Sequence, residues 1–326
     1  MIKIWGVKMS RTRVFYTSDI HGSERVFLKL LNSVKIYKAK VVIVGGDLSG
    51  KRLIPIIDKG NGIYETVFLG EKVEVSSRSS LENIIDRIRA VGYYPYITSE
   101  SMLEELNNDE NRLNEVFESL IAETMRRWMK YVDEKLAKSD IRLFIMPGND
   151  DPYIIDHILT ESEHVTNPDG QVVPIDDYHE MVSLGVSNMT PWRCIRDLEE
   201  AEISRTLDFL VDKVDNIGNA IFNIHVPPYG TSIDMAPKLD ETLKPVLTPG
   251  GGYEMVNVGS LAVREAIEKY QPKLGLHGHV HESRGVAKIG RTLCFNPGSE
   301  YTEGILRGVL LELDKDKIRD YLLIQG

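Results

Sequence analysis

The sequence predicts an α/β fold in which parallel strands bring a set of polar residues to one edge of a sheet. Apolar, strand-type runs recur along the chain, and a helical pattern connects the first two of them. An aspartate, asparagine or histidine follows most of these runs directly. Residues so far apart in sequence can act together only if their strands lie side by side and their loops reach one edge.

Residues 13–50 have the pattern strand, helix, strand. Residues 14–17 and 41–44 are apolar and rich in β-favouring side chains, and the second run is continuous, as in a buried parallel strand. Residues 24–33 carry apolar side chains at helical spacing behind Ser23, an N-cap candidate. We therefore expect two parallel strands joined by a helix.

Residues 51–140 differ in character from the segments on either side. The first part indicates two or three strands separated by glycine turns, Ser79 and Glu82 have capping-box spacing, and residues 113–136 trace a long amphipathic helix. With 13 basic and 17 acidic residues, the segment is mildly acidic. We expect a single domain over residues 1–326, with this segment as a cap-like insertion over or beside the site. Peripheral structure without a substrate role is the alternative.

The alternation of strands and helices resumes after residue 140. No internal repeat, coiled coil or low-complexity tract interrupts it. The expected strands cover 143–146, 221–224, 273–276, 292–295 and 305–313, the expected helices cover 198–214 and 258–270, and 172–187 has an antiparallel pattern.

Composition and charge restrict the classes of function. The formal charge of −10 disfavours a broad electrostatic grip on nucleic acid. No apolar run reaches the roughly 18 residues that span a bilayer, and residues 1–10 lack the apolar core and cleavage site of a secretory signal. Cys194 and Cys294 are expected as free thiols, with a single disulfide as the alternative. A cytoplasmic location is the default expectation.

The first two strand ends carry residue types that bind metal ions. Asp19 and His21 lie two positions apart, so both can reach one ion if the segment is extended and then turns. Asp47 follows Gly45-Gly46, which allows sharp turning and close approach, and a carboxylate can bridge two ions. Taken alone, such a pair is most often part of a surface loop, and a capping aspartate in a turn is the alternative for Asp47.

Two later strand ends continue the series. Asn149 follows Pro147-Gly148, and its amide oxygen is a neutral ligand that avoids excess negative charge. An asparagine turn is the alternative interpretation. His225 stands between a strand and two prolines, where a purely structural histidine is the alternative.

The strongest single motif is His277-Gly278-His279-Val280-His281. Alternating residues of an extended segment lie on one face. Three imidazoles on one strand face are poor core material, because each has polar nitrogens that need partners. Metal coordination satisfies them. Gly278 indicates that His279 and His281 are the ligands and that His277 supports them or faces the substrate.

Taken together and in this order, these pieces resemble the calcineurin-like metallophosphoesterase family. The loop Asn296-Pro297-Gly298-Ser299 also resembles the one that follows the last histidines in that family. The resemblance implies a two-sheet α/β sandwich flanked by helices, with residues 51–140 as a mixed strand and helix insertion. It also implies a ligand set in which Asp19, His21 and His281 hold one metal, Asn149, His225 and His279 hold the other, and Asp47 bridges them.

The implied chemistry is hydrolysis of phosphate esters. Two divalent ions clamp the ester and lower the pKa of a bridging water, and the resulting hydroxide attacks phosphorus. Imidazole and carboxylate ligands suit manganese, iron, zinc or cobalt better than calcium. We expect a small phosphomonoester or phosphodiester as substrate, nucleotide-like in character. The oligomeric state is not predicted.

One residue departs from the family pattern. The motif usually continues from the asparagine to a histidine that assists the leaving group, and here that position is Asp150. A carboxylate beside two cations stays ionised and repels a phosphate unless it is protonated or turned away. We expect Asp150 to affect the chemistry at this position, with His277 as a candidate proton donor.

Two other functions remain open at this level. A scaffold or sensor that keeps the metal fold and binds a protein partner is favoured by Asp150 and by the large insertion. A DNA-processing nuclease of the same superfamily is disfavoured by the acidic insertion. Lys51 and Arg291 can contact a phosphate, although we expect both to be solvated, and the loop 190–193 is expected either to line a pocket or to form a buried turn.

Overall fold

The computed structural model describes residues 11–326. The expectation about a secretory signal falls on residues 1–10 and therefore lies outside the described residues. Among the helices of the described part, none has the combined length and apolar character that a bilayer crossing requires.

The first half of the sandwich is a six-stranded sheet with the order β20-β19-β1-β2-β7-β8. Its centre is parallel, because α1 returns the chain from β1 to β2 and the inserted segment returns it from β2 to β7. An antiparallel hairpin, β19–β20, completes one edge. The bounds are β1 Thr12–Thr17, α1 Glu24–Tyr37, β2 Val41–Gly45, β7 Arg142–Met146, β8 Val165–Thr166, β19 Arg307–Leu313 and β20 Ile318–Gln325.

The second half is another six-stranded sheet with the order β17-β18-β16-β13-β10-β9. Strands β10, β13, β16 and β18 run parallel, while β9 and β17 pair antiparallel at the two edges. The bounds are β9 Val172–Pro174, β10 Glu180–Leu184, α6 Glu200–Val211, β13 Ile221–Ile224, α7 Leu261–Tyr270, β16 Leu274–Leu276, β17 Gly285–Ile289 and β18 Thr292–Asn296.

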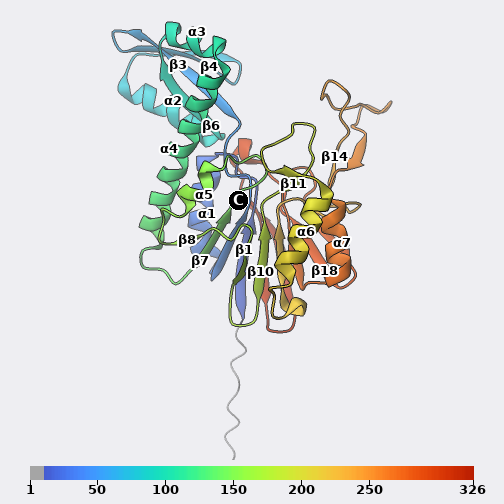
Figure 1. Cartoon of the computed structure of the whole chain (residues 1–326). Coiled ribbons are helices and arrows are strands. Elements are labelled where there is room, and N and C mark those ends of the chain that lie inside the picture. The colour runs from blue at the N-terminus through green and yellow to red at the C-terminus, as the bar shows by residue number, and fades with distance from the viewer. Residues whose placement is uncertain (1–10) are drawn as a thin grey trace, which may run out of the picture.

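The two sheets pack face to face around a shared apolar core. Tyr16, Ile43, Phe144, Ile221 and Phe295 belong to this core, and all are fully or almost fully buried. Helices α1, α4 and α5 (Ile154–Leu159) cover the outer face of the first sheet, and α6 and α7 cover that of the second (Figure 1). The predicted two-sheet sandwich flanked by helices is confirmed.

The inserted segment forms a third layer with its own sheet, of order β5-β4-β3-β6, and its own small core of Ile54, Ile56, Phe68, Ile84 and Ile88. Figure 1 shows it at the top of the molecule, above the edge where the loops of the sandwich meet. Its bounds are β3 Arg52–Gly60, β4 Ile63–Phe68, β5 Glu71–Val75, α2 Arg78–Ala90, β6 Tyr93–Thr98, α3 Glu100–Asn108 and α4 Glu110–Leu136.

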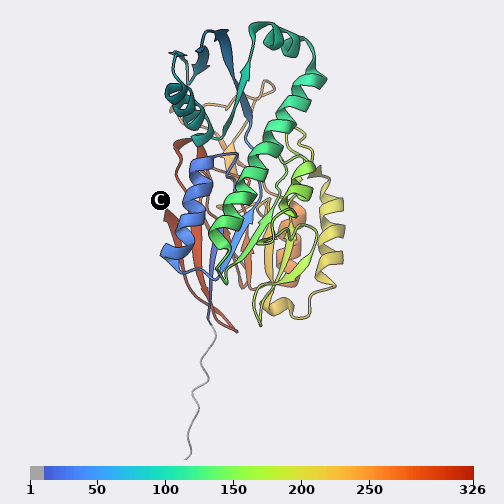
Figure 2. The same ribbon diagram turned by 90° about the vertical axis from the view of Figure 1, so that its left-hand side faces the viewer.

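Helix α4 connects this layer to the sandwich. Its second half packs beside α1, where Trp128 stacks on Phe27 with ring centroids 4.1 Å apart, as the adjacent helices in Figure 2 show. The predicted long amphipathic helix is therefore present, and it begins at Glu110, directly after Asp109, whose side chain caps it.

Several local expectations were wrong. The capping box of α2 is formed by Ser77 and Ser80, because the Ser77 side chain reaches the Ser80 amide, not by Ser79 and Glu82. Sequence patterns also missed β6, α3 and β20. The remaining short strands are β11 Ser187–Asn188, β12 Asp197–Leu198, β14 Met235–Pro237 and β15 Met255–Asn257.

Candidate metal centre

The loops after β1 and β2 run side by side and hold each other through backbone hydrogen bonds. The amide of Asp19 donates to the Gly46 carbonyl (3.0 Å), that of His21 to Asp47 (3.0 Å) and that of Gly22 to Leu48 (2.7 Å). Adjacent parallel strands therefore deliver their first polar residues to one place. Asp19 and Asp47 are almost completely buried there.

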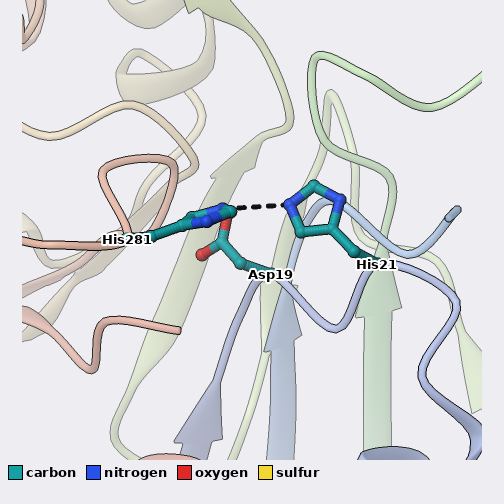
Figure 3. Close-up of side chains that lie close together, drawn as sticks. All are labelled: Asp19, His21 and His281. Carbon is teal, nitrogen blue, oxygen red and sulfur yellow. Dashed lines mark hydrogen bonds and ion pairs between the residues drawn. The ribbon is translucent and has the colours of Figure 1, made fainter. Parts of the chain in front are cut away.

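Three predicted ligands from opposite ends of the chain form the first cluster. Figure 3 shows Asp19, His21 and His281 pointing toward one another. The two Nε2 atoms of His21 and His281 are 3.0 Å apart, and His281 Nε2 is 3.5 Å from Asp19 Oδ1. All the facing ligand atoms lie within 4.8 Å of one another, a spacing at which they could hold a metal ion.

The second cluster contains Asp47, His225 and His279, again with ligand atoms within 4.8 Å of one another. His225 Nε2 lies 3.3 Å from Asp47 Oδ1, and His279 Nδ1 lies 3.0 Å from the amide oxygen of Asn149. The other carboxylate oxygen of Asp47, Oδ2, is 3.5 Å from His21 Nε2. Asp47 therefore faces both clusters, one oxygen to each.

The ligand side chains are oriented by partners on the protein side. His21 Nδ1 faces the Ser49 carbonyl (3.2 Å) and His225 Nδ1 faces the Gly45 carbonyl (2.8 Å), so the Nε2 lone pair of each ring points into the cluster. His279 contacts the Ser187 hydroxyl through Nε2 at 3.2 Å. These partners lie far from the ligands in sequence or are backbone atoms, so sequence patterns could not identify them.

The charges at the centre fit divalent cations. Burial alone would lower the pKa of His225, but the carboxylates of Asp47 and Asp19 raise it to about 10. Its Nε2 atom is buried and has no hydrogen-bond partner among the described residues. Two buried carboxylates thus favour positive charge at a point surrounded by imidazole nitrogens, and a divalent ion with nitrogen and oxygen ligands supplies that charge in place of a proton on His225.

Backbone strain is concentrated at this centre. Asp19, His21, Asp47 and His279 all have positive φ values, of 58°, 44°, 51° and 65°. Non-glycine residues rarely adopt this left-handed conformation, and they keep it where surrounding contacts dictate it. The strain turns each side chain from its strand direction toward the common point, and no sequence pattern predicts it.

Three glycines are required by close packing around the ligands. A Cβ atom on Gly46 would lie 2.4 Å from His225 Nδ1, one on Gly148 would lie 2.1 Å from Asp47 Oδ1, and one on Gly278 would lie 2.1 Å from the Ser18 hydroxyl. The close approach expected at Gly46 is confirmed. The same reasoning extends to the two glycines that precede Asn149 and His279.

Asp151 is a positioning residue that the sequence interpretation missed. It is fully buried, and its carboxylate accepts hydrogen bonds from the amides of Leu48, Ser49 and Gly148 and from the Ser49 hydroxyl. It therefore joins the loop after β2 to the loop after β7. The available signal was the second aspartate of Asp150-Asp151, which directly follows the predicted ligand Asn149.

The loop after β18 also matches its expected place. The Ser299 hydroxyl donates to the Asp19 carbonyl (2.6 Å), and the Asn296 amide group donates to the Val280 carbonyl (2.8 Å). The ring of Tyr301 lies 4.8 Å from that of His21, centroid to centroid. This loop therefore braces the first cluster through contacts with Asp19 and His21.

Of the two residues predicted to act in catalysis, Asp150 and His277, only Asp150 lies beside the predicted ligands His21 and Asp47. One of its oxygens lies within 4.8 Å of ligand atoms of His21 and Asp47. His277 is fully buried, its Nδ1 faces the Ile224 and Val226 carbonyls, and burial lowers its pKa to about 4. The structure thus places His277 beneath the ligands, where none of its contacts faces the cluster, and its catalytic role stays a prediction.

The two basic residues considered as phosphate contacts differ in placement. Arg291 binds the backbone and side chain of Gln271 and has no contact with the clusters. Lys51 is half exposed to solvent, as expected, and its ammonium also pairs with Asp150, a carboxylate that lies beside His21 and Asp47.

Asp197 supports one of the ligands from the loop before α6. Its Oδ1 accepts from the Asn149 side-chain amide (2.9 Å), which turns the amide oxygen toward His279. Because such partners typically change metal affinity by about 10- to 100-fold, we expect Asp197→Ala to weaken metal binding by about that factor. Titration of the metal-free protein with manganese measures it. Asp208→Ala on the outer face of α6 is the matched control, and equal affinities in the two variants would contradict the role of Asp197.

Comparison with known proteins identifies the family. Residues 12–283 match the calcineurin-like phosphoesterases. The chain belongs to this family. An uncharacterized protein of Methanocaldococcus jannaschii is 33% identical over 171 residues, which cover 51% of this chain and 69% of that protein.

Solved structures show the same fold. The crystal structure of TT1561 of Thermus thermophilus is 14% identical, with 97% of this chain and 99% of that chain covered and a TM-score of 0.52. A second crystal structure is 17% identical over 96% of this chain and 99% of the other, with a TM-score of 0.55. At these identities the likeness concerns the fold alone.

Proposed function

We propose that this calcineurin-like phosphoesterase hydrolyses small phosphomonoesters or phosphodiesters with the help of two divalent metal ions. The observation that carries the proposal is the position of Asp47, whose two carboxylate oxygens face two separate groups of imidazole and carboxylate ligands. A buried carboxylate shared in this way suits a pair of ions better than a single one.

The predicted ligands divide into two sets, one for each proposed ion. Asp19, His21 and His281 would hold one ion, and Asn149, His225 and His279 the other, with Asp47 between them. Such ions supply charge stabilisation for the phosphate and acidify a water molecule. The protein fixes the orientation of the ligand side chains, because His21 contacts the Ser49 carbonyl and His225 contacts the Gly45 carbonyl. Manganese, iron, zinc and cobalt all suit this donor set.

A loop beside the site supports a substrate with an aromatic part, such as a nucleotide. Asp197 Oδ2 accepts from the Thr190 hydroxyl and the Cys194 amide, and the Arg196 amide donates to the Asn149 carbonyl. The loop is therefore clamped to a ligand-bearing segment. Its outermost part carries Trp192, which is 63% exposed. An exposed indole on a loop that is tied to a ligand-bearing segment is suited to stacking on a base.

The stacking role leads to a substrate-dependent prediction. Because base stacking on an aromatic ring contributes about 1–3 kcal/mol, we expect Trp192→Ala to lower kcat/KM for a nucleoside phosphodiester by about 5- to 100-fold. The value for an alkyl phosphodiester should stay within about twofold. Phe209→Ala, an exposed aromatic on the outer face of α6, is the control. An equal loss on both substrates would contradict stacking.

The direct test of the proposed function is a substrate panel. Protein freed of metal and reloaded with manganese, cobalt, zinc or iron is assayed on aryl and nucleoside monoesters and diesters, with metal content measured in parallel. We expect turnover that requires bound metal at a stoichiometry of two per chain. Two bound ions without turnover on any ester would instead favour a scaffold or sensor, the alternative function.

A further inference from the structure

The position usually occupied by a histidine in this family holds an ion pair in this chain. Asp150 Oδ2 lies 2.5 Å from the Lys51 ammonium, and Oδ1 accepts from the Cys194 thiol at 2.8 Å. The backbone amide of Asp150 donates to Asp47 Oδ1 at 3.2 Å. The carboxylate is thus held at both oxygens and fixed beside His21 and Asp47, so it is not free to turn away.

The pairing changes the electrostatics of the mouth of the site. An unpaired carboxylate here would repel a phosphate, but the Lys51 ammonium cancels its charge. Burial alone would lower the pKa of Lys51, yet the carboxylates of Asp150 and Asp47 raise it on balance, so the ammonium keeps its proton. One of its N–H groups points to Asp150, which leaves two for another acceptor.

The geometry places this ammonium within reach of a substrate. An Asp150 oxygen lies within 4.8 Å of ligand atoms of His21 and Asp47, and Lys51 is bonded to that carboxylate. The Lys51 side chain is 50% exposed and Asp150 only 21%, so the cation sits between the cluster and solvent. In contrast, the pair Lys40–Asp140 is exposed at both ends, at 59% and 80%, and has no such neighbours.

We propose that Lys51, positioned by Asp150, is a phosphate-binding residue that donates hydrogen bonds to the ester group of the substrate in place of the missing histidine. The inference rests on the proposed function and specifies its substrate contact. Lys51 stabilises the negative charge of the phosphate as a fixed cation and transfers no proton. Asp150 acts through Lys51: it restrains a flexible side chain that would otherwise be spread through solvent.

The test uses inorganic phosphate as the probe, with metal content measured in every sample. Calorimetric titration of the manganese-loaded protein compares wild type with Lys51→Ala, Lys51→Arg and the surface control Lys40→Ala. Lys51→Ala removes charge-assisted hydrogen bonds to the phosphate. We therefore expect this variant to bind phosphate about 10- to 100-fold more weakly, with two ions still bound. Lys51→Arg should stay within about fivefold of wild type, and Lys40→Ala should match it.

A double variant separates the charge of Asp150 from the loss of Lys51. In Lys51→Ala the carboxylate is left unpaired and repels phosphate, so Asp150→Asn added to Lys51→Ala should recover about fivefold or more of the lost affinity, by removal of a nearby like charge. Failure to recover any affinity would overturn the electrostatic account of the pair.

Other results of the phosphate titration would overturn the role of Lys51 or separate it from the proposed function. Wild-type phosphate affinity in Lys51→Ala, loss of metal from that variant, or no phosphate binding by the metal-loaded wild type would overturn the proposal. If the wild type binds phosphate through Lys51 but hydrolyses no ester in the panel, the proposed function fails while the phosphate-binding role stands. The two claims are therefore distinguished by the same set of samples.

Discussion

Asp47→Asn is expected to reduce metal-dependent ester hydrolysis by at least about 1,000-fold, since the stabilisation lost with a metal pair amounts to several kcal/mol. Asparagine keeps the size of the side chain but has one acceptor oxygen and no charge. It can face His225 or His21, but not serve both clusters as the two carboxylate oxygens do. Steady-state rates on an aryl phosphodiester, with metal content, measure the effect.

The control for this variant is Asp140→Asn, which removes an exposed carboxylate whose partner among residues 11–326 is Lys40. It should keep wild-type rates and two ions per chain. The Asp47→Asn protein should bind at most one ion tightly. A variant at Asp47 that hydrolyses the ester at the wild-type rate would show that the shared carboxylate is not part of the catalytic site.

Gly148→Ala should produce the second largest effect through sterics alone. Its Cβ would lie 2.1 Å from Asp47 Oδ1 and 2.3 Å from the Asp47 amide nitrogen, distances that real Cβ atoms do not reach. Either Asp47 or the loop after β7 has to move. Because forced overpacking costs about 1–3 kcal/mol, we expect a lower free energy of unfolding by that amount. Displacement of the Asp47 carboxylate should also reduce activity by about 100-fold or more, since misplacement by about 1 Å has such an effect.

Gly250→Ala is the matched control, because nothing lies within 4 Å of its added Cβ and its φ is not positive. Chemical denaturation and manganese titration of both variants check the prediction. If Gly148→Ala retained wild-type metal affinity and activity, the tight packing between this glycine and Asp47 would have no functional role.

The parts of the fold predicted best were those in which local pattern and burial agree. The strands at Val14 and Val41 are apolar on both faces, and the helix between them has a single apolar stripe, so period and composition point to one answer. Strands β6 and β20 were missed because tyrosines, charges and a proline interrupt their patterns. Their pairing with β3 and β19 compensates for weak local signals.

The candidate site also has features that the sequence predicts and features that depend on the tertiary structure. Its set of metal-type residues was predictable from the ordered combination of strand ends, although each residue taken alone has a structural alternative. The order of these residues along the chain supported the family resemblance, and residues 12–283 match that family. In contrast, His277 shares the motif of His279 and His281 but turns beneath them, since it still belongs to the buried strand side of the loop.

By itself, the sequence determined the set of metal-type side chains, the strands that carry them and the class of fold, because these depend on residue type and local periodicity. The tertiary structure alone decided which atoms face one another: the left-handed turns at Asp19 and Asp47, the four hydrogen bonds of Asp151 and the pairing of Lys51 with Asp150. Several of these contacts join residues about 100 positions apart in the sequence. Their energies come from packing and electrostatics across space, which local sequence patterns do not encode.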